Sequence, residues 1–271
     1  MSEHQYAAGP RRITHAICQA RDAIQSVSQN QKGCAFAEMD FKSAYDKIAL
    51  SWTWKVLSKK NCSPAFTETM RQLYETSYVI SIVNNEQQPR ILNKRQNIKQ
   101  GDRASTILYN YSADALLVHL HKRLQGVVYH KLTKAGPRHP KLGRPTPLEA
   151  RLSVLGFVDD VKCALTSLKE FEMLDAGVRL FERASGSELH RDPTTKKCQL
   201  LTMGKWSKWK QDQSPLGYLA VVEELNFLGV KLARTISKSR ALNGEELTSR
   251  VKSKIASWAG RHSPWCAGRT C

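Results

Sequence analysis

Apolar residues recur at helical spacing in several stretches of the chain. Over residues 13–27 they fall at Ile13, Ala16, Ile17, Ala20, Ile24 and Val27, which predicts a helix with one buried face. The same period predicts helices over residues 46–60, 64–75 and 105–124. The second of these begins at Ser63-Pro64, a common start signal, because proline fits the first helical turn.

Short apolar runs bounded by polar residues predict strands between these helices. Residues 34–40 alternate like a half-buried strand, and residues 78–83 and 90–92 flank a turn at 84–86. Residues 152–158 and 161–165 are separated only by Asp159 and Asp160, which predicts a hairpin with two carboxylates at its tip. With no repeat of fixed period, the chain is expected to form one continuous unit of mixed helices and strands.

The Asp159-Asp160 pair is unusual for a hairpin tip. Asn-Gly or Asp-Gly normally occupies such a turn because φ must be positive there. Adjacent acids repel each other and lose hydration unless a cation neutralises them, and Mg²⁺ prefers such oxygen ligands. Asp40, at the end of the apolar strand 35–39, is the candidate third carboxylate. Separately, Asp40 could cap the following helix and the Asp pair could be a surface turn.

The charge balance indicates a polyanionic partner. The chain of 271 residues has 42 Lys and Arg against 24 Asp and Glu, a net charge of +18. Nucleic acid is the favoured partner, with a merely solubilising basic surface as the alternative. No stretch approaches the ~20 apolar residues of a membrane span, and residues 1–10 lack the apolar core of a signal peptide. We therefore expect an intracellular protein with no membrane partner.

Basic residues are concentrated in one acid-free segment, between Asp114 and Glu149. Its glycines and prolines predict an exposed loop that contacts phosphates, and the alternative is a solvated insertion without a partner. The basic residues are Lys122, Arg123, Lys131, Lys134, Arg138, Lys141 and Arg144.

With these residues in place, the chain resembles reverse transcriptases of the non-LTR (LINE-type) retrotransposon family. Residues 40–46, DFKSAYD, resemble the first catalytic motif of that family. Gln100, Gly101 and Ser105 resemble the next motif, a Gln-Gly turn before a helix that supports the template and nucleotide. Residues 157–160, FVDD, resemble the aromatic-x-Asp-Asp box.

The resemblance continues downstream in the same order. The helix 170–184, with Ser185-Gly186 and Lys196-Lys197 after it, resembles the fourth palm motif. A later run of four residues resembles the primer grip of the family: Phe227, Leu228, Gly229 and Val230. Residues 9–17 look like the end of the fingers, and residues 250–261 look like the first thumb helix.

This resemblance implies an α+β fold, a right-hand polymerase palm whose central antiparallel sheet packs against helices, with partial fingers and thumb. It implies a fingers remnant at 1–33 and a palm at 34–230, with a fingers insertion at about 60–99 and the basic loop at about 128–150. Residues 231–271 are expected to begin the thumb. The chain is expected to be a piece of a larger polyprotein; oligomeric state is not indicated.

The resemblance also implies the chemistry. Asp40, Asp159 and Asp160 would bind two Mg²⁺ ions, with Mn²⁺ as an alternative, and Asp160 would bind less directly than Asp159. Lys196, or its neighbour Lys197, would donate a proton to pyrophosphate. The implied partners are an RNA template, a DNA primer and deoxynucleoside triphosphates.

The remaining implied contacts are with substrate and nucleic acid. Tyr45 would exclude a ribose 2′-hydroxyl and so select deoxynucleotides, unless it is simply a packed core aromatic. Viral RNA polymerases, which share the acid pair, place an Asp at that position. The other residues expected to contact substrate are Phe41, Gln100, Gly101 and Ser105. Those expected to contact nucleic acid are Lys131, Lys134, Arg138, Lys141, Phe227, Leu228 and Gly229.

One motif departs from the family. The Gln-Gly turn usually continues as Pro-Leu-Ser-Pro, but of that run only Ser105 is present here. Two further readings stay open: a truncated copy that binds nucleic acid without catalysis, and a basic RNA-binding protein in which the Asp pair is coincidental.

Overall fold

The computed structural model describes residues 2–6, 12–30, 32–75, 78–93, 98–99, 102–131 and 148–259. Within them the chain forms helices α1 (Ile13–Asn30), α2 (Ala44–Lys47), α3 (Leu50–Lys59), α4 (Pro64–Glu75), α5 (Arg103–Arg123), α6 (Leu168–Ser185) and α7 (Ile236–Ala259). The strands are β1 (Cys34–Met39), β2 (Tyr78–Val83), β3 (Glu86–Asn93), β4 (Val127–Lys131), β5 (Leu148–Leu152), β6 (Val154–Phe157), β7 (Asp160–Leu165), β8 (Gln199–Met203), β9 (Ala220–Val222), β10 (Glu224–Phe227) and β11 (Val230–Ala233).

A five-stranded sheet with the order β6-β7-β1-β8-β9 is the centre of the fold. Strand β1 is antiparallel to both of its neighbours, whereas β9 runs parallel to β8. Three two-stranded sheets, β2–β3, β4–β5 and β10–β11, lie outside it. The fold is therefore α+β with a mostly antiparallel central sheet, as the sequence predicts.

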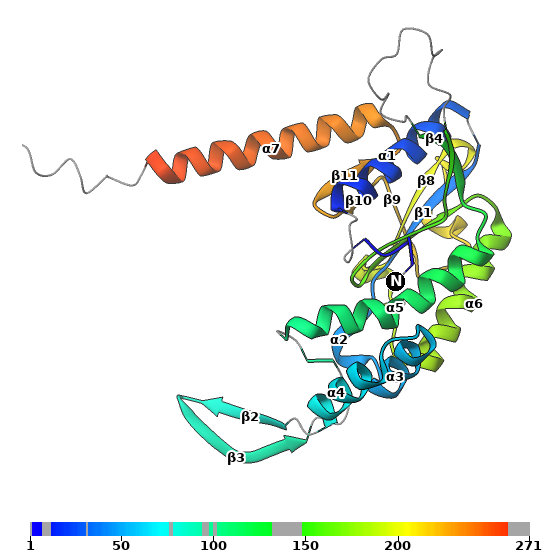
Figure 1. Ribbon diagram of the computed structural model, residues 1–271. Helices are drawn as coiled ribbons and strands as arrows, with labels where there is room; N and C mark the ends of the chain where they lie inside the picture. Colours follow the sequence, from blue (N-terminus) through cyan, green and yellow to red (C-terminus); the bar gives the residue numbers. More distant parts are fainter. Residues whose placement is uncertain are drawn as a thin grey trace, which may run out of the picture.

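Both faces of the central sheet are covered. Alternate residues of β1 point to opposite faces: Ala35, Ala37 and Met39 join the core beneath α5 and α6, whereas Cys34 and Phe36 join the core beneath α1. Figure 1 shows α5 and α6 on one side of the sheet, and α1 with the β10–β11 hairpin on the other. Because a buried core covers each face of the sheet, functional side chains are expected at the ends of its strands.

Most predicted elements are present, with three differences. The predicted helix 46–60 is divided into α2 and α3, because the amide of Ala49 donates to the carbonyl of Ser185 (2.7 Å) and Ile48 is fully buried. The helix expected at 250–261 is the end of a longer helix, α7. Within the predicted basic loop, β4 and β5 pair with each other.

Several predicted features lie outside the described residues. They include Gln100 and Gly101, and also Lys134, Arg138 and Lys141 of the basic loop. Lys131 ends β4, but its side chain is not described. The division into fingers, palm and thumb stays a prediction. Of the helices in the described ranges, none is long and apolar enough to cross a membrane.

Candidate active site

The register of the central sheet brings the predicted carboxylates together. In the antiparallel pair β1–β7, Met39 lies opposite Val161, so one further residue along the same register places Asp40 beside Asp160. Strand β6 ends at Phe157, which pairs with Asp160, and Asp159 lies in the turn between them. The hairpin is therefore present, but Asp160 is the first residue of β7 and not part of the turn.

The turn that carries Asp159 has a strained backbone. Val158 has a φ of 57°, in the left-handed region that a β-branched residue rarely adopts. Such conformations cost on the order of 1–3 kcal/mol and gather at functional sites. The strained residue immediately precedes Asp159, so the turn places that carboxylate at the strand end at a cost in stability.

The electrostatics of the acids suit a bound cation. Burial raises the pKa of Asp159 above its usual value, and the negative charges of Asp160 and Asp40 raise it further. The side chains of Asp40 and Asp160 are about a third and a quarter exposed, at 34% and 26%, so the group is open to solvent on one side. Carboxylate oxygens are the hard ligands that divalent cations such as Mg²⁺ prefer. The donor set therefore fits a divalent metal ion.

The oxygens of the three aspartates do not all lie within 4.8 Å of one another. Among the described residues, the three-residue set whose ligand atoms all lie within 4.8 Å of one another is Glu3, His4 and His121, not the three aspartates. That set is poorly suited to a metal, because the rings of His4 and His121 are stacked with centroids 3.8 Å apart and Arg151 lies 2.9 Å from Nε2 of His121. The aspartates remain the better candidate site.

Two basic side chains face Asp40 from the segment that follows α6. Nζ of Lys197 lies 3.6 Å from Oδ2 of Asp40, and Nε2 of His190 lies 3.9 Å from the same oxygen. The amide of His190 also donates to the carbonyl of Asp40 (3.0 Å). Lys196 is exposed, with a φ of 51°. The ammonium beside the carboxylate is thus that of Lys197, not of Lys196, and His190 is a neighbour that the sequence analysis missed.

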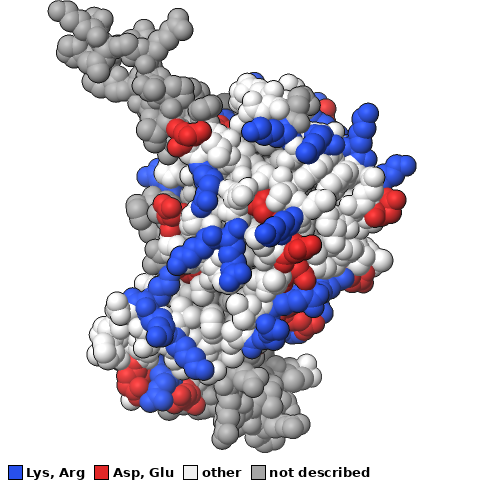
Figure 2. Space-filling view, turned by 90° about the vertical axis from the view of Figure 1, so that its right-hand side faces the viewer, with Lys and Arg blue, Asp and Glu red and all other residues white. Residues whose placement is uncertain are grey.

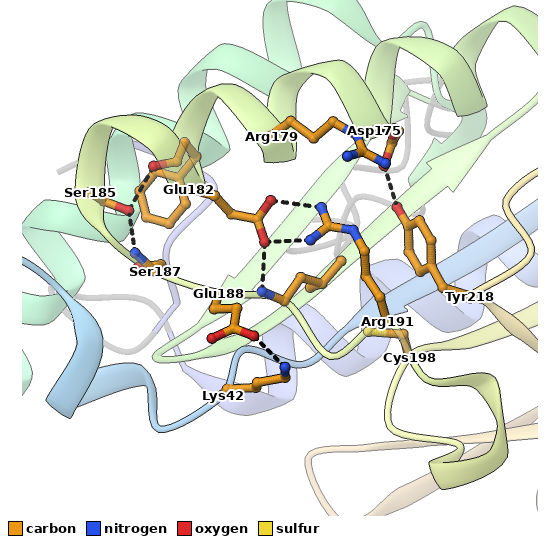
Figure 3. Close-up of polar contacts among 12 residues, drawn as sticks. Lys42, Asp175, Arg179, Glu182, Ser185, Ser187, Glu188, Arg191, Cys198 and Tyr218 are labelled. Carbon is orange, nitrogen blue, oxygen red and sulfur yellow. Dashed lines mark hydrogen bonds and ion pairs between the residues drawn. The ribbon is translucent and has the colours of Figure 1, made fainter.

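A clamp of ion pairs anchors this segment to α6 (Figure 3). Glu182 accepts hydrogen bonds from both terminal nitrogens of Arg191 and from the amide of Leu189, each at 2.7 Å. The guanidinium of Arg191 lies over the ring of Tyr218, 5.5 Å from its centroid, and the Tyr218 hydroxyl donates to Asp175 (3.1 Å). The clamp fixes the chain on both sides of His190.

The same segment is also tied to the chain that follows Asp40. Glu188 pairs with Lys42, as Figure 3 shows, and also with Lys47 of α2. These two hydrogen bonds lower the pKa of Glu188 to about 2. Because all three side chains are substantially exposed, these pairs contribute little stability and act mainly on local geometry.

Tyr45 lies on α2, half-buried, with its ring stacked on that of Tyr109 (centroids 4.8 Å apart). Tyr109 is fully buried, and burial raises its pKa, so its phenol stays neutral. The Tyr45 hydroxyl reaches Thr106 of α5 only at 3.5 Å. The Tyr45 ring is therefore held by stacking on Tyr109, while the residue as a whole remains only partly buried.

The other described candidates for substrate contact are buried. Phe41 packs edge-on against Phe181 of α6, with ring centroids 5.8 Å apart. Ser105 is bonded to the carbonyl of Lys99 and to the hydroxyl of Tyr74. Both side chains support the elements that carry Asp40 and the start of α5, and neither offers its polar or aromatic surface to solvent.

The hairpin β10–β11 lies against the carboxylate edge of the sheet. Leu228 and Gly229 form its turn, both with positive φ (53° and 79°), a conformation that hairpin turns of two residues favour. Phe227 is buried, and its ring centroid lies 4.8 Å from Nζ of Lys162, which is itself bonded to Asp160. The buried ring of Phe227 therefore has no free face to offer nucleic acid, unlike the turn that follows it.

Basic side chains are abundant at the surface. Figure 2, which views the molecule from the right-hand side of Figure 1, shows Lys and Arg in a band across that face, with fewer Asp and Glu between them. This distribution agrees with the net charge of +18. A surface of this kind attracts polyanions without regard to sequence.

Comparison with known proteins identifies the family. The family described as "Reverse transcriptase (RNA-dependent DNA polymerase)" matches residues 1–232. The chain is also similar to the solved structure of apo telomerase from Candida tropicalis, with a TM-score of 0.54 and 8% identity over 85% of this chain and 36% of that one. For telomerase from Candida albicans, solved in complex with a fragment of telomeric RNA, the TM-score is 0.51 and the identity 12%, over 82% and 32%. No curated protein sequence matches the chain.

The structural similarity concerns the fold, since the identities are low. The chain spans about a third of the length of the telomerase chains that it matches. The family match covers most of the chain and includes all three aspartates, strands β1 and β7, and the hairpin β10–β11 except for its last residue. The chain belongs to the reverse transcriptase family, and its α+β fold of a mostly antiparallel sheet packed against helices is the polymerase fold of that family.

Proposed function

We propose that the chain carries the polymerase centre of a non-LTR (LINE-type) retrotransposon reverse transcriptase, which copies an RNA template into DNA. The observation that carries this proposal is the meeting of Asp40 and Asp160 in the register of β1 and β7, with Asp159 in the adjoining turn. The motif order supports it, from DFKSAYD at 40–46 through FVDD at 157–160 to the hairpin at 227–230.

In this proposal Asp40, Asp159 and Asp160 hold two divalent ions, Mg²⁺ or alternatively Mn²⁺. When bound, such ions lower the pKa of the primer 3′-hydroxyl and stabilise the charge on the leaving pyrophosphate. The protein positions the reactants and contributes fixed charges. Lys197, 3.6 Å from Asp40, is now the better candidate than Lys196 to donate a proton to pyrophosphate.

The proposed partners are an RNA template, a DNA primer and deoxynucleoside triphosphates. Tyr45, which is half-buried and stacked on Tyr109, would meet a ribose 2′-hydroxyl and so favour deoxynucleotides. The turn at Leu228 and Gly229 would contact the primer, because it lies at the carboxylate edge. Phosphates would be bound along the basic segment that includes Lys131, Lys134, Arg138 and Lys141.

Primer extension on an RNA template tests the proposal. Asp40→Asn and Asp159→Asn should each reduce metal-dependent DNA synthesis by orders of magnitude, because each removes one charged metal ligand. Binding of primed template should persist in both. Asp212→Asn, at an exposed position in the loop before β9, is the matched control and should keep normal rates.

Two results would contradict the proposal. Normal synthesis by both Asn variants would exclude the aspartates as metal ligands. A wild-type chain that binds primed template tightly but never extends it, with either metal, would support the alternative of a fragment that binds nucleic acid without catalysis.

A further inference from the structure

Lys162 is a buried cation inside the carboxylate group. It lies on β7 directly opposite Glu38 of β1, and its side chain is only 1% exposed. Its Nζ donates to Oε1 of Glu38 (2.8 Å) and to Oδ1 of Asp160 (2.5 Å), and it lies over the ring of Phe227. The ammonium is therefore held by groups from β1, β7 and β10.

The position of Lys162 follows from strand geometry. Residues two apart on a strand share a face, so Lys162 lies on the same side of β7 as Asp160, and Glu38 on the same side of β1 as Asp40. An unpaired buried ammonium would cost several kcal/mol. The ammonium of Lys162 is paired with two carboxylates and lies over an aromatic ring. Its burial is therefore compensated, and Lys162 is a structural part of the site.

Asp160 and Asp159 differ in their partners, because Lys162 forms an ion pair with Asp160. Oδ1 of Asp160 accepts the ammonium, whereas no ion pair involves Asp159 in the parts of the chain that the structure describes. A divalent ion would meet Asp159 without a competing cation, and Asp160 with one oxygen already bonded to the ammonium. The ammonium would also repel the ion, because the two positive charges share a partly buried site.

We propose that Lys162 is a positioning residue of the metal site, which engages one oxygen of Asp160, leaves the other for a metal ion and lowers the affinity of the free protein for divalent cations. This inference rests on the proposed function and goes beyond it. It assigns unequal roles to the two neighbouring aspartates and gives the physical cause of the difference.

Binding of Mn²⁺ to the free protein, measured by electron paramagnetic resonance, tests the inference without nucleotide or activity. Lys162→Met, which keeps the length of the side chain and removes its charge, should bind Mn²⁺ roughly tenfold more tightly, as expected for the loss of a nearby like charge. Lys169→Met is the control of equal net charge, since Lys169 is exposed in the first turn of α6, beyond the end of β7 that lies away from Asp160. Its Mn²⁺ affinity should equal that of the wild type.

A double variant separates direct contact from net charge. Glu38→Gln with Lys162→Met removes one negative and one positive charge, so the formal charge of the site is unchanged. If Lys162 acts by engaging Asp160, this variant still binds Mn²⁺ more tightly than the wild type. It also removes the charge of Glu38, which would otherwise be left without its partner, and this favours folding if Lys162→Met alone is unstable.

A third variant closes the cycle. In an Asp160→Asn background, Lys162→Met should raise Mn²⁺ affinity by a smaller factor than it does in the wild type, because the part of the effect that passes through Asp160 is lost and only the repulsion between the two cations remains. Wild-type affinity in the double variant, or an equal effect with and without Asp160, would overturn the inference. If Asp40→Asn binds Mn²⁺ as well as the wild type does, the proposed metal site itself fails, which is a different result from unchanged affinity in the Lys162 variants alone.

Discussion

The clamp between Glu182 and Arg191 makes a prediction that connects stability with the geometry of the site. Glu182→Gln keeps the shape of the side chain but removes the charge that accepts three hydrogen bonds. Hydrogen bonds to charged groups contribute about 1.5–3 kcal/mol each. Because both side chains are partly exposed, at 14% and 29%, and Gln keeps an acceptor oxygen, we expect a loss below the sum of three such bonds, about 3 kcal/mol.

Thermal and urea unfolding would measure this loss. At 2–4 °C per kcal/mol for a domain of this size, Tm should fall by roughly 6–12 °C. Hydrogen exchange gives the local readout, because the amide of His190 donates to the carbonyl of Asp40 and should exchange faster when the clamp is weakened. Arg179→Ala is the matched control on α6: the Arg179 side chain is 56% exposed in its ion pair with Asp175, so the cost should stay below about 1 kcal/mol.

The reasoning fails if Glu182→Gln costs no more than Arg179→Ala. It also fails if the variant is destabilised while exchange at His190 is unchanged, because the clamp would then stabilise α6 without fixing the segment that faces Asp40.

Two further predictions concern buried and half-buried groups. Asp114→Asn should lower the free energy of unfolding by about 3 kcal/mol in urea titrations, because Lys60 loses the partner of a buried ion pair. Burial alone would raise the pKa of Asp114, but hydrogen bonds from Lys60 and Ser2 outweigh it and leave the pKa lowered. The contribution of Asp114 to the free energy of unfolding is therefore fully present above the ordinary Asp pKa of about 3.8, and it is lost as pH falls through the lower pKa of the folded state. If the difference in unfolding free energy between wild type and variant does not shrink on acidification, this reasoning is wrong. Tyr45→Val should raise ribonucleotide relative to deoxynucleotide incorporation in single-nucleotide extension, and an unchanged ratio with activity retained would make Tyr45 a core aromatic only.

The elements that can be predicted from the sequence are those with one buried face, whose apolar spacing is visible within a short stretch of the chain. Helices α1 and α4 follow from apolar spacing, and the hairpin β6–β7 follows from two apolar runs around the Asp pair. The break between α2 and α3 does not follow, because residues 46–60 all suit a helix. It depends on the hydrogen bond between Ala49 and Ser185, which only the folded chain creates.

The candidate site divides in the same way. Asp40, Asp159 and Asp160 were identifiable because acids at the ends of apolar strands are unusual. Lys162 was overlooked within a run taken as apolar, since its partner Glu38 lies 124 residues earlier in the sequence. Nothing local distinguishes a buried paired lysine from one at an exposed strand edge.

The dependence of the site on strand register has a consequence for insertions and deletions. Asp40 meets Asp160 only because Met39 pairs with Val161. One residue added within β1 would turn Asp40 to the opposite face, where α5 and α6 pack, and would move part of the apolar set that now faces those helices to the face that α1 covers. By contrast, an insertion at Asn84-Asn85, in the exposed turn of β2–β3, changes no strand of the central sheet. Length variation among related chains should therefore be confined to such turns, and a library of random single-residue insertions should recover polymerases with changes there and none within β1.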